Sequence, residues 1–336
     1  KIIEILILLL AATTNLPLYL YFTIYGLVSI IFTSLLFNFI KNLMPEFFPW
    51  WQSGNWSTAL KNFFSSIAVT LNGFIEQFNT NNGVFLVITS MFGVSALPVF
   101  TTQKTIGNLF SQVTSLYVNP LTPEIIRFHA TKEFYKINQL NKVSWFINTI
   151  VVNIPLILIF PFVGNLFNIW TRGKLVFNQE LCACIFITVS IINFARFYII
   201  YLSSINHLKS LMAISIVKSI ILFCSVFVLI HFYGWFGLGL SIIFSEFIGS
   251  VFVAGYYSNR LTPISHVYAT ISFFPTIILS ASCYLIINFN GLQYYTLTLS
   301  LVLVLFVLIF QWKNLTSDIK NRFIGLIYQL KKIEYQ

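Results

Sequence analysis

Long runs of apolar residues, separated by short polar stretches, dominate the chain. A helix that crosses the hydrocarbon core of a bilayer needs about 20 predominantly apolar residues. By this measure the pattern predicts ten membrane segments, at residues 2–13, 18–40, 62–92, 94–118, 143–170, 181–205, 208–232, 235–257, 266–289 and 294–312. The first segment is short and the chain begins at Lys1 without Met, so we expect that the sequence starts inside a longer protein.

The composition supports a membrane environment. Hydrophobic residues make up 57% of the chain and charged residues only 8%, whereas soluble domains carry about 25% charged residues. We therefore predict an all-α polytopic membrane protein. The four cysteines lie in apolar segments, and the pair Cys182 and Cys184 has no His or third Cys nearby, so no metal site is predicted.

The positions of the basic residues predict the orientation of the chain. If the loop at residues 41–61 is cytoplasmic, thirteen Lys and Arg residues fall on the cytoplasmic side and only Arg172 and Lys174 fall outside. Such a bias is typical of cytoplasmic loops, and it explains the net charge of +10 without a nucleic-acid partner. It also places the C-terminus in the cytoplasm, where residues 313–336 have the pattern of an amphipathic helix at the membrane surface.

Five ionisable side chains fall within the predicted segments. A charge at the centre of a bilayer costs roughly 2.5–3.5 kcal/mol, so such groups normally face a cavity or one another. The five are Glu76, Lys104, Arg196, Lys218 and Glu246. Facing one cavity, three cations and two carboxylates would suit a substrate with an anionic head and an apolar tail. The alternative is internal ion pairing, Glu76 with Lys104 or Glu246 with Lys218, which would only tie helices together.

The segment at residues 62–92 has a polar centre that contains Gln77, Asn79, Asn81 and Asn82. Residues 79–83 could form an external turn, or the polar side chains could lie along one helix that lines a water-filled cavity. The turn would leave residues 84–118 as a single helix, too long for a bilayer unless Pro98 breaks it. We favour the cavity-lining helix.

The sequence gives no indication of an enzyme. The predicted loops are short, no Walker-type glycine loop is present, and all four histidines fall at predicted membrane edges. A membrane polysaccharide polymerase or acyltransferase would need a large external loop or a His-based catalytic site.

Four stretches together suggest a family. They are the polar-centred helix at residues 73–94, the exit through Pro120, Pro123, Glu124 and Arg127, the stretch at residues 163–173, and residues 204–246. In this order they resemble the polysaccharide flippases of the MOP superfamily, especially the O-antigen (Wzx-type) transporters. The resemblance implies the fifth to fourteenth helices of a two-lobe transporter. Residues 1–50 would be a remnant of the N-terminal lobe, 56–257 the C-terminal lobe, 262–312 an added helix pair and 313–336 the cytoplasmic tail.

The resemblance also implies a function. Such a protein would flip undecaprenyl-diphosphate-linked oligosaccharide repeat units across the bacterial inner membrane, for O-antigen or capsular polysaccharide, by rocking two lobes around a central cavity. Its partners would be the lipid-linked oligosaccharide, membrane lipids, and polysaccharide polymerase and chain-length machinery. The roles implied are diphosphate binding by Lys104, Arg196 and Lys218, sugar contacts by Gln77, Asn79, Asn81 and Asn82, and H⁺ or Na⁺ coupling by Glu76 or Glu246. A multidrug or metabolite antiporter of the same superfamily is the alternative, although three buried cations speak against it.

Overall fold

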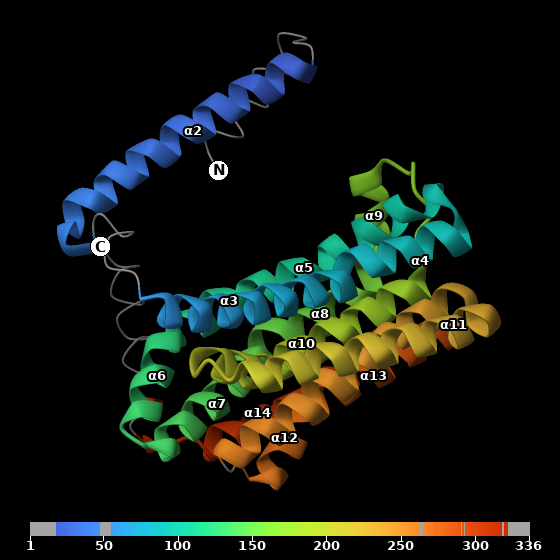
Figure 1. Ribbon diagram of the computed structural model, residues 1–336. Coiled ribbons are helices and arrows are strands. Elements are labelled where there is room, and N and C mark those ends of the chain that lie inside the picture. The colour runs from blue at the N-terminus through green and yellow to red at the C-terminus, as the bar shows by residue number, and fades with distance from the viewer. Residues whose placement is uncertain are drawn as a thin grey trace, which may run out of the picture. The chain divides into compact units, whose positions relative to one another are not determined.

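The computed structural model describes residues 18–47, 55–262, 265–289, 291, 293–317 and 319–321. The protein is all-α and 92% helical, and it divides into two compact units, Lys1–Ser66 and Ile67–Gln336 (Figure 1). The α-helices are α2 (Leu18–Leu43), α3 (Trp56–Gln77), α4 (Gly83–Phe92), α5 (Leu97–Val118), α6 (Thr122–Ala130), α7 (Phe134–Asn148), α8 (Ile154–Ile159), α9 (Val163–Thr171), α10 (Gln179–Ser204), α11 (Leu208–Glu246), α12 (Ala254–Leu261), α13 (His266–Asn288) and α14 (Gln293–Lys313). The π-helices are η2 (Phe78–Asn82), η5 (Thr149–Asn153) and η7 (Phe247–Val253), and the 3-10 helices are η1 (Pro45–Phe47), η3 (Val94–Ala96), η4 (Asn119–Leu121) and η6 (Phe160–Phe162).

Helix α2 makes up most of what is described of the first unit. Its stretch Phe22–Leu43 is apolar enough to cross a membrane; most of its residues are exposed and none is buried. Apolar side chains exposed along a whole helix are typical of a surface that faces lipid. The segment predicted at residues 2–13 lies outside the described residues.

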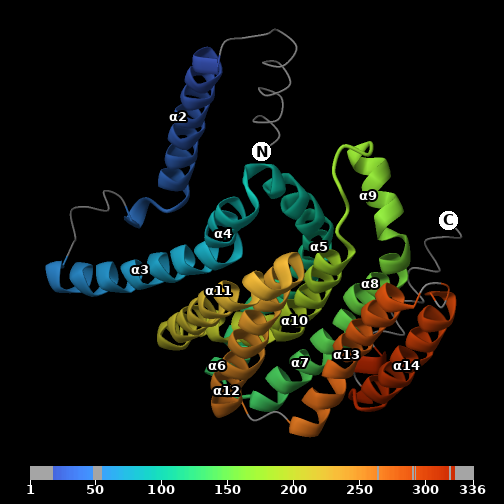
Figure 2. The same cartoon turned by 90° about the vertical axis from the view of Figure 1, so that its right-hand side faces the viewer.

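The second unit is built around α10, which is buried over most of its length and packs against α5, α11 and α13 (Figure 2). Glycines allow the closest approaches. A Cβ atom added at Gly239 of α11 would lie 2.4 Å from Cβ of Cys184, and one added at Gly107 of α5 would lie 2.9 Å from Cγ2 of Ile185. Larger side chains at either position would push a helix away from α10.

Helix α11 is a hairpin of two helices that meet at Gly234. This residue has φ 54° and ψ −126°, a conformation that only glycine adopts without strain. Gly237 lies against the carbonyl of Leu229, and farther from the turn the Ser245 hydroxyl donates to the Lys218 carbonyl. The two halves therefore run antiparallel. The break predicted between residues 232 and 235 is confirmed.

The polar segment before α5 is helical throughout. Helices α3, η2 and α4 follow one another from Trp56 to Phe92, and the chain breaks only at Gly93, which has φ 84°. An external turn at residues 79–83 is therefore wrong. Pro98 lies in the first turn of α5 and does not interrupt a helix, because the first turn needs no N–H donor at that position.

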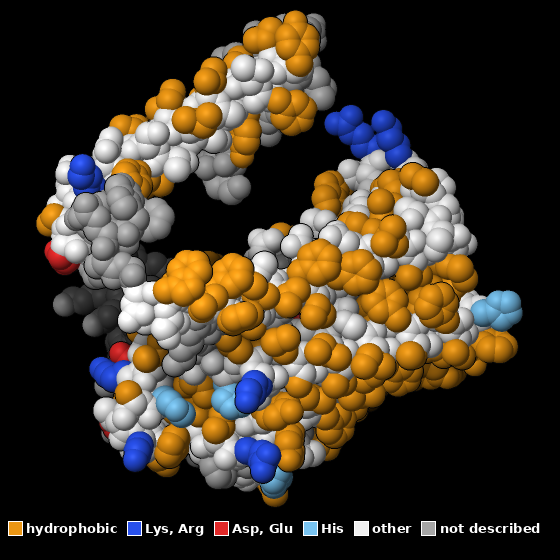
Figure 3. Space-filling view, in the orientation of Figure 1, with side chains coloured by type: hydrophobic (Ala, Val, Ile, Leu, Met, Phe, Trp, Pro, Cys, Tyr) orange, Lys and Arg blue, Asp and Glu red, His pale blue; other side chains and the backbone are white. Residues whose placement is uncertain are grey.

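Within the described residues, six helical stretches are long and apolar enough to cross a membrane, so the chain is a multi-pass membrane protein. They are Phe22–Leu43, Phe134–Thr171, Gln179–Ser204, Leu208–Leu261, His266–Asn288 and Gln293–Lys313. These six stretches do not show the predicted count of about ten. The first predicted segment is not described, the α11 hairpin counts once, and the polar segments at residues 62–92 and 94–118 are not among the six. On the face of the larger unit seen in Figure 3, hydrophobic side chains cover the long sides of the helices, and most of the Lys and Arg side chains lie towards their ends.

Helices α5 and α10 run parallel. Asn193 donates to the Ser111 hydroxyl (3.3 Å) and, one turn further along both helices, Arg196 donates to the Ser115 hydroxyl (2.6 Å). The stretch Phe134–Thr171 returns the chain between them. The distribution of basic residues likewise predicts that successive membrane segments cross in alternating directions. Of the predicted cytoplasmic tail, residues 318 and 322–336 lie outside the described residues.

Candidate functional site

The larger unit contains a cavity of about 260 Å³ bounded by η2, α4, α5, α10 and α11. Its polar wall is formed by Asn79, Thr80, Asn81, Lys104, Asn108, Ser111, Thr188, Ser245 and Glu246, and apolar residues such as Phe100 and Leu222 complete it. Among the described residues, Lys104 and Glu246 are the only charged side chains that line it. The cavity therefore offers one cation, one carboxylate, and several amides and hydroxyls.

Lys104 projects from α5 towards the π-helix η2. Its Nζ donates to Oδ1 of Asn81 (3.0 Å) and to the carbonyl of Thr80. No carboxylate oxygen of the described residues lies within 4.0 Å of Nζ. An ammonium group has three donors, so one N–H remains for a ligand in the cavity. A single-turn π-helix within an α-helical run, such as η2, frequently marks a functional site.

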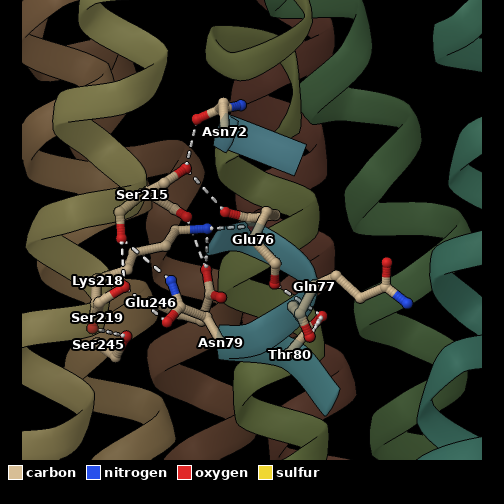
Figure 4. A network of polar contacts seen from close by, with 11 residues as sticks. Asn72, Glu76, Gln77, Asn79, Thr80, Ser215, Lys218, Ser219, Ser245 and Glu246 are labelled. Carbon is tan, nitrogen blue, oxygen red and sulfur yellow. Dashed lines mark hydrogen bonds and ion pairs between the residues drawn. The ribbon is translucent and has the colours of Figure 1, made fainter. Parts of the chain in front are cut away.

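A second lysine, Lys218, is held between two carboxylates (Figure 4). Its Nζ lies 3.0 Å from Oε1 of Glu76 and 3.0 Å from Oε2 of Glu246, and the residue is only 2% exposed. The three residues come from α3 and from the two halves of α11. We call them the Lys218 triad. With two carboxylates and one ammonium, its formal charge is −1.

Hydroxyl and amide groups hold the triad in place. The Ser250 hydroxyl donates to Oε2 of Glu246 (2.7 Å), and the Ser215 hydroxyl lies 3.2 Å from Oε2 of Glu76. Asn79 donates to the Ser215 carbonyl (3.1 Å) and accepts from the Ser219 hydroxyl (2.8 Å). Because Asn79 also lines the cavity, this network fixes the cavity wall to α11 (Figure 4).

Gly249 makes room for the lysine. A Cβ atom added there would lie 2.3 Å from Cγ of Lys218. The sequence prediction missed Gly249 and the serines of the network. The spacing of Ser215 and Ser219 around Lys218, and of Ser250 four residues after Glu246, is the signal that could have found them, since these positions share a helix face.

The predicted site residues thus divide into two groups. Lys104, Asn79, Asn81 and Glu246 line the cavity, whereas Lys218, Glu76, Arg196, Gln77 and Asn82 do not. Gln77 and Asn82 are exposed, and the Gln77 side chain points away from the triad in Figure 4. The pairing expected for Glu246 with Lys218 is present. Glu76 also pairs with Lys218, and not with Lys104.

Arg196 lies just beyond the cavity. It is one turn along α10 from Ile192, which lines the cavity, and it binds Ser115 one turn along α5 from the lining residue Ser111. Its Nε is buried and has no partner among the described residues. In the predicted orientation Arg196 is on the cytoplasmic side of the cavity.

Among the described residues, no group of three or more His, Cys, Asp or Glu is placed to hold a metal ion. No protein-family model, curated protein or solved structure matches the chain. The geometry of the cavity and the sequence resemblance therefore carry the functional conclusion.

Proposed function

We propose that this chain is a transporter, not an enzyme, and that it flips undecaprenyl-diphosphate-linked oligosaccharide repeat units across the bacterial inner membrane. The observation that carries the proposal is Lys104, an ammonium group on the wall of a polar cavity, whose Nζ has no carboxylate oxygen of the described residues within 4.0 Å. A charge in such a place costs free energy unless an opposite charge compensates it. A diphosphate head group would supply that charge, and lysine is a common phosphate ligand.

The rest of the wall suits the sugars that follow a diphosphate. The amides of Asn79, Asn81 and Asn108 and the hydroxyl of Thr188 can donate to and accept from sugar hydroxyls. A volume of about 260 Å³ is just below the range of roughly 300–1,000 Å³ for small-molecule sites. In this form the cavity would hold the diphosphate and the first sugar, and a longer repeat unit would require the lobes to open. Arg196 would receive the diphosphate as it enters from the cytoplasm.

The finer architecture belongs to the same proposal. The chain would cross the membrane about ten times, as the fifth to fourteenth helices of a fourteen-helix transporter, with its C-terminus in the cytoplasm.

Glu246 touches both the cavity and Lys218, so it would couple substrate movement to H⁺ or Na⁺. Polysaccharide polymerase and chain-length machinery would act on the exported product.

The orientation has a direct test. In cells, a membrane-impermeant maleimide should label Arg172→Cys without permeabilisation, and Arg260→Cys only after the membrane is opened. Both substitutions are made in a Cys224→Ser background, because Cys224 is the exposed native cysteine of the part described and Cys182, Cys184 and Cys283 are buried. The opposite labelling pattern would invert the proposed topology.

A cation antiporter is the second candidate, and the structure provides an observation in its favour. In the sequence, three buried cations argue against an antiporter. Of these, Lys218 is neutralised within a triad of formal charge −1, and Arg196 lies outside the cavity. Glu246 on the wall could therefore attract a cation, with Lys104 as the opposing charge.

Binding to the purified full-length protein distinguishes the two candidates. We expect undecaprenyl diphosphate to bind at least about tenfold more tightly than undecaprenol, because the diphosphate adds a charge-assisted hydrogen bond to Lys104. The cationic dye ethidium should not compete. Equal Kd values for the diphosphate and the alcohol, together with saturable ethidium binding, would favour the antiporter and contradict the flippase.

A further inference from the structure

A second hollow in the larger unit is a groove of about 540 Å³ between α10, η7, α12 and α13. The two hollows share no lining residue, so the groove is separate from the candidate transport cavity. Most of its wall is aromatic or aliphatic, and its polar groups include Asn259, Arg260 and His266.

The polar and apolar parts of the groove lie at opposite ends. Helix α12 ends at Leu261 and α13 begins at His266, so Arg260 and His266 mark the end at the connection between these helices. From His266 to Ile277 the α13 wall runs eleven residues, or about 16 Å at 1.5 Å per residue, and becomes apolar at Phe273 and Ile277. A basic head end and a long apolar body match the shape of a membrane lipid.

The head end has the groups to bind a particular kind of head. Arg260 is exposed, and its guanidinium lies 5.5 Å from the centre of the Tyr256 ring, a stacking contact that orients it. A guanidinium binds phosphate through two parallel hydrogen bonds. Oδ1 of Asn259 is buried and has no hydrogen-bond partner among the described residues. A hydrogen-bond donor of the ligand close to the phosphate, such as a hydroxyl group, would satisfy this acceptor.

The groove is also open to the surroundings of the helices. Phe252 and Tyr256 on its wall are 59% and 57% exposed. The distribution of basic residues places Arg260 on the cytoplasmic side, where anionic lipids attract basic groups. A lipid could therefore enter sideways from the inner leaflet.

We propose that this groove binds an anionic glycerophospholipid whose head group carries a hydroxyl, such as phosphatidylglycerol. Arg260 and His266 bind its phosphate, the Asn259 side-chain carbonyl accepts from the head-group hydroxyl, and one acyl chain lies along Phe252, Phe273 and Ile277. The lipid fills the space between α12 and α13 and so holds the two helices together. This site does not depend on which substrate the other cavity carries.

Native mass spectrometry of the purified full-length protein tests the site. Wild-type protein should retain phosphatidylglycerol and discriminate against phosphatidylcholine, whose head has no donor. Arg260→Gln should reduce the retained phosphatidylglycerol about tenfold or more, as expected for the loss of a charge-assisted hydrogen bond. The matched control is Lys209→Gln, which also removes an exposed charge, at the start of α11 and outside the groove, and it should retain lipid as the wild type does.

A second variant distinguishes the effect of filling the groove from the effect of removing the Arg260 charge. Thr270→Trp keeps Arg260 and His266 but fills the groove from its exposed α13 wall, and it should also lose the lipid. Far-UV circular dichroism and gel filtration confirm that each variant is folded. Equal retention in all variants, equal binding of phosphatidylcholine, or displacement of the lipid by inorganic phosphate alone would overturn the proposal.

Discussion

Replacing Lys104 with alanine should abolish transport and weaken binding of undecaprenyl diphosphate by at least about tenfold, while the protein still folds and inserts. The physical reason is that Lys104 is the one cation lining the cavity among the described residues, and its loss removes a charge-assisted hydrogen bond of about 1.5–3 kcal/mol. The fold should tolerate the change, because Lys104 is half-buried and, in the part of the chain that is described, its hydrogen bonds go to one carbonyl and one amide oxygen. Surface polysaccharide in cells that depend on the full-length protein measures transport, and Kd measures binding.

Two further variants make the result specific. Lys104→Arg keeps the charge and should retain part of the activity, since a guanidinium also binds phosphate. Asn82→Ala is the matched control, because Asn82 belongs to the same polar segment but is exposed and does not line the cavity. Wild-type polysaccharide levels in Lys104→Ala would rule out the cationic site, and a loss of activity in Asn82→Ala as large as that in Lys104→Ala would show that the effect is not specific to the cavity.

Much of the helical arrangement could be predicted from the sequence. Segments that lie within a bilayer must be apolar, so the hydrophobicity of a segment indicates whether it lies within the membrane. The break at Gly234 follows from two apolar runs separated by a short Tyr-Gly stretch. The polar segment around Asn79 was harder to interpret. Its amides are typical of a turn, and only contacts with another helix make them acceptable within a span: Asn79 is buried by Ser215 and Ser219, more than 130 residues away in the chain.

Pairing among the five ionisable residues could be predicted only in part, because it depends on how helices pack: Glu246 with Lys218 was one expected pair, whereas Glu76 was expected with Lys104 and pairs with Lys218. Depth along the chain placed all five within spans, and it made three cations facing one cavity a reasonable expectation. Glu76 and Lys218 are separated by 142 residues and meet because α3 lies beside the first half of α11, while Gly249 of η7 leaves room for the Lys218 side chain. Arg196 has the right depth but lies one turn beyond the cavity on α10. A cavity expected to hold three cations and two carboxylates thus contains, among the described residues, one lysine and one glutamate.

Because Lys218 pairs with Glu76 and Glu246, its replacement should affect the stability of the protein as well as transport. At the level of sequence we expect Lys218→Ala, like Lys104→Ala, to stop transport and leave insertion intact. In the structure Lys218 neutralises Glu246, whose side chain is only 8% exposed. Lys218→Met should therefore lower the free energy of unfolding by about 3–5 kcal/mol, the usual cost of removing one partner from a buried ion pair. The measurement is the denaturant midpoint of the full-length protein in detergent.

Replacing Glu246 and replacing Glu76 should lower the denaturant midpoint by different amounts. Glu246→Gln removes the more buried partner and should destabilise the protein more than Glu76→Gln, because the Glu246 side chain is 8% exposed and the Glu76 side chain 40%. Combining Lys218→Met with both Gln substitutions leaves no buried charge and should recover most of the lost stability, since a buried ion pair contributes little over a neutral replacement. The triple variant also separates stability from transport: a stable protein that no longer transports would assign the triad to ion coupling. If Lys218→Met unfolds at the same denaturant concentration as the wild type, the triad does not hold the helices together.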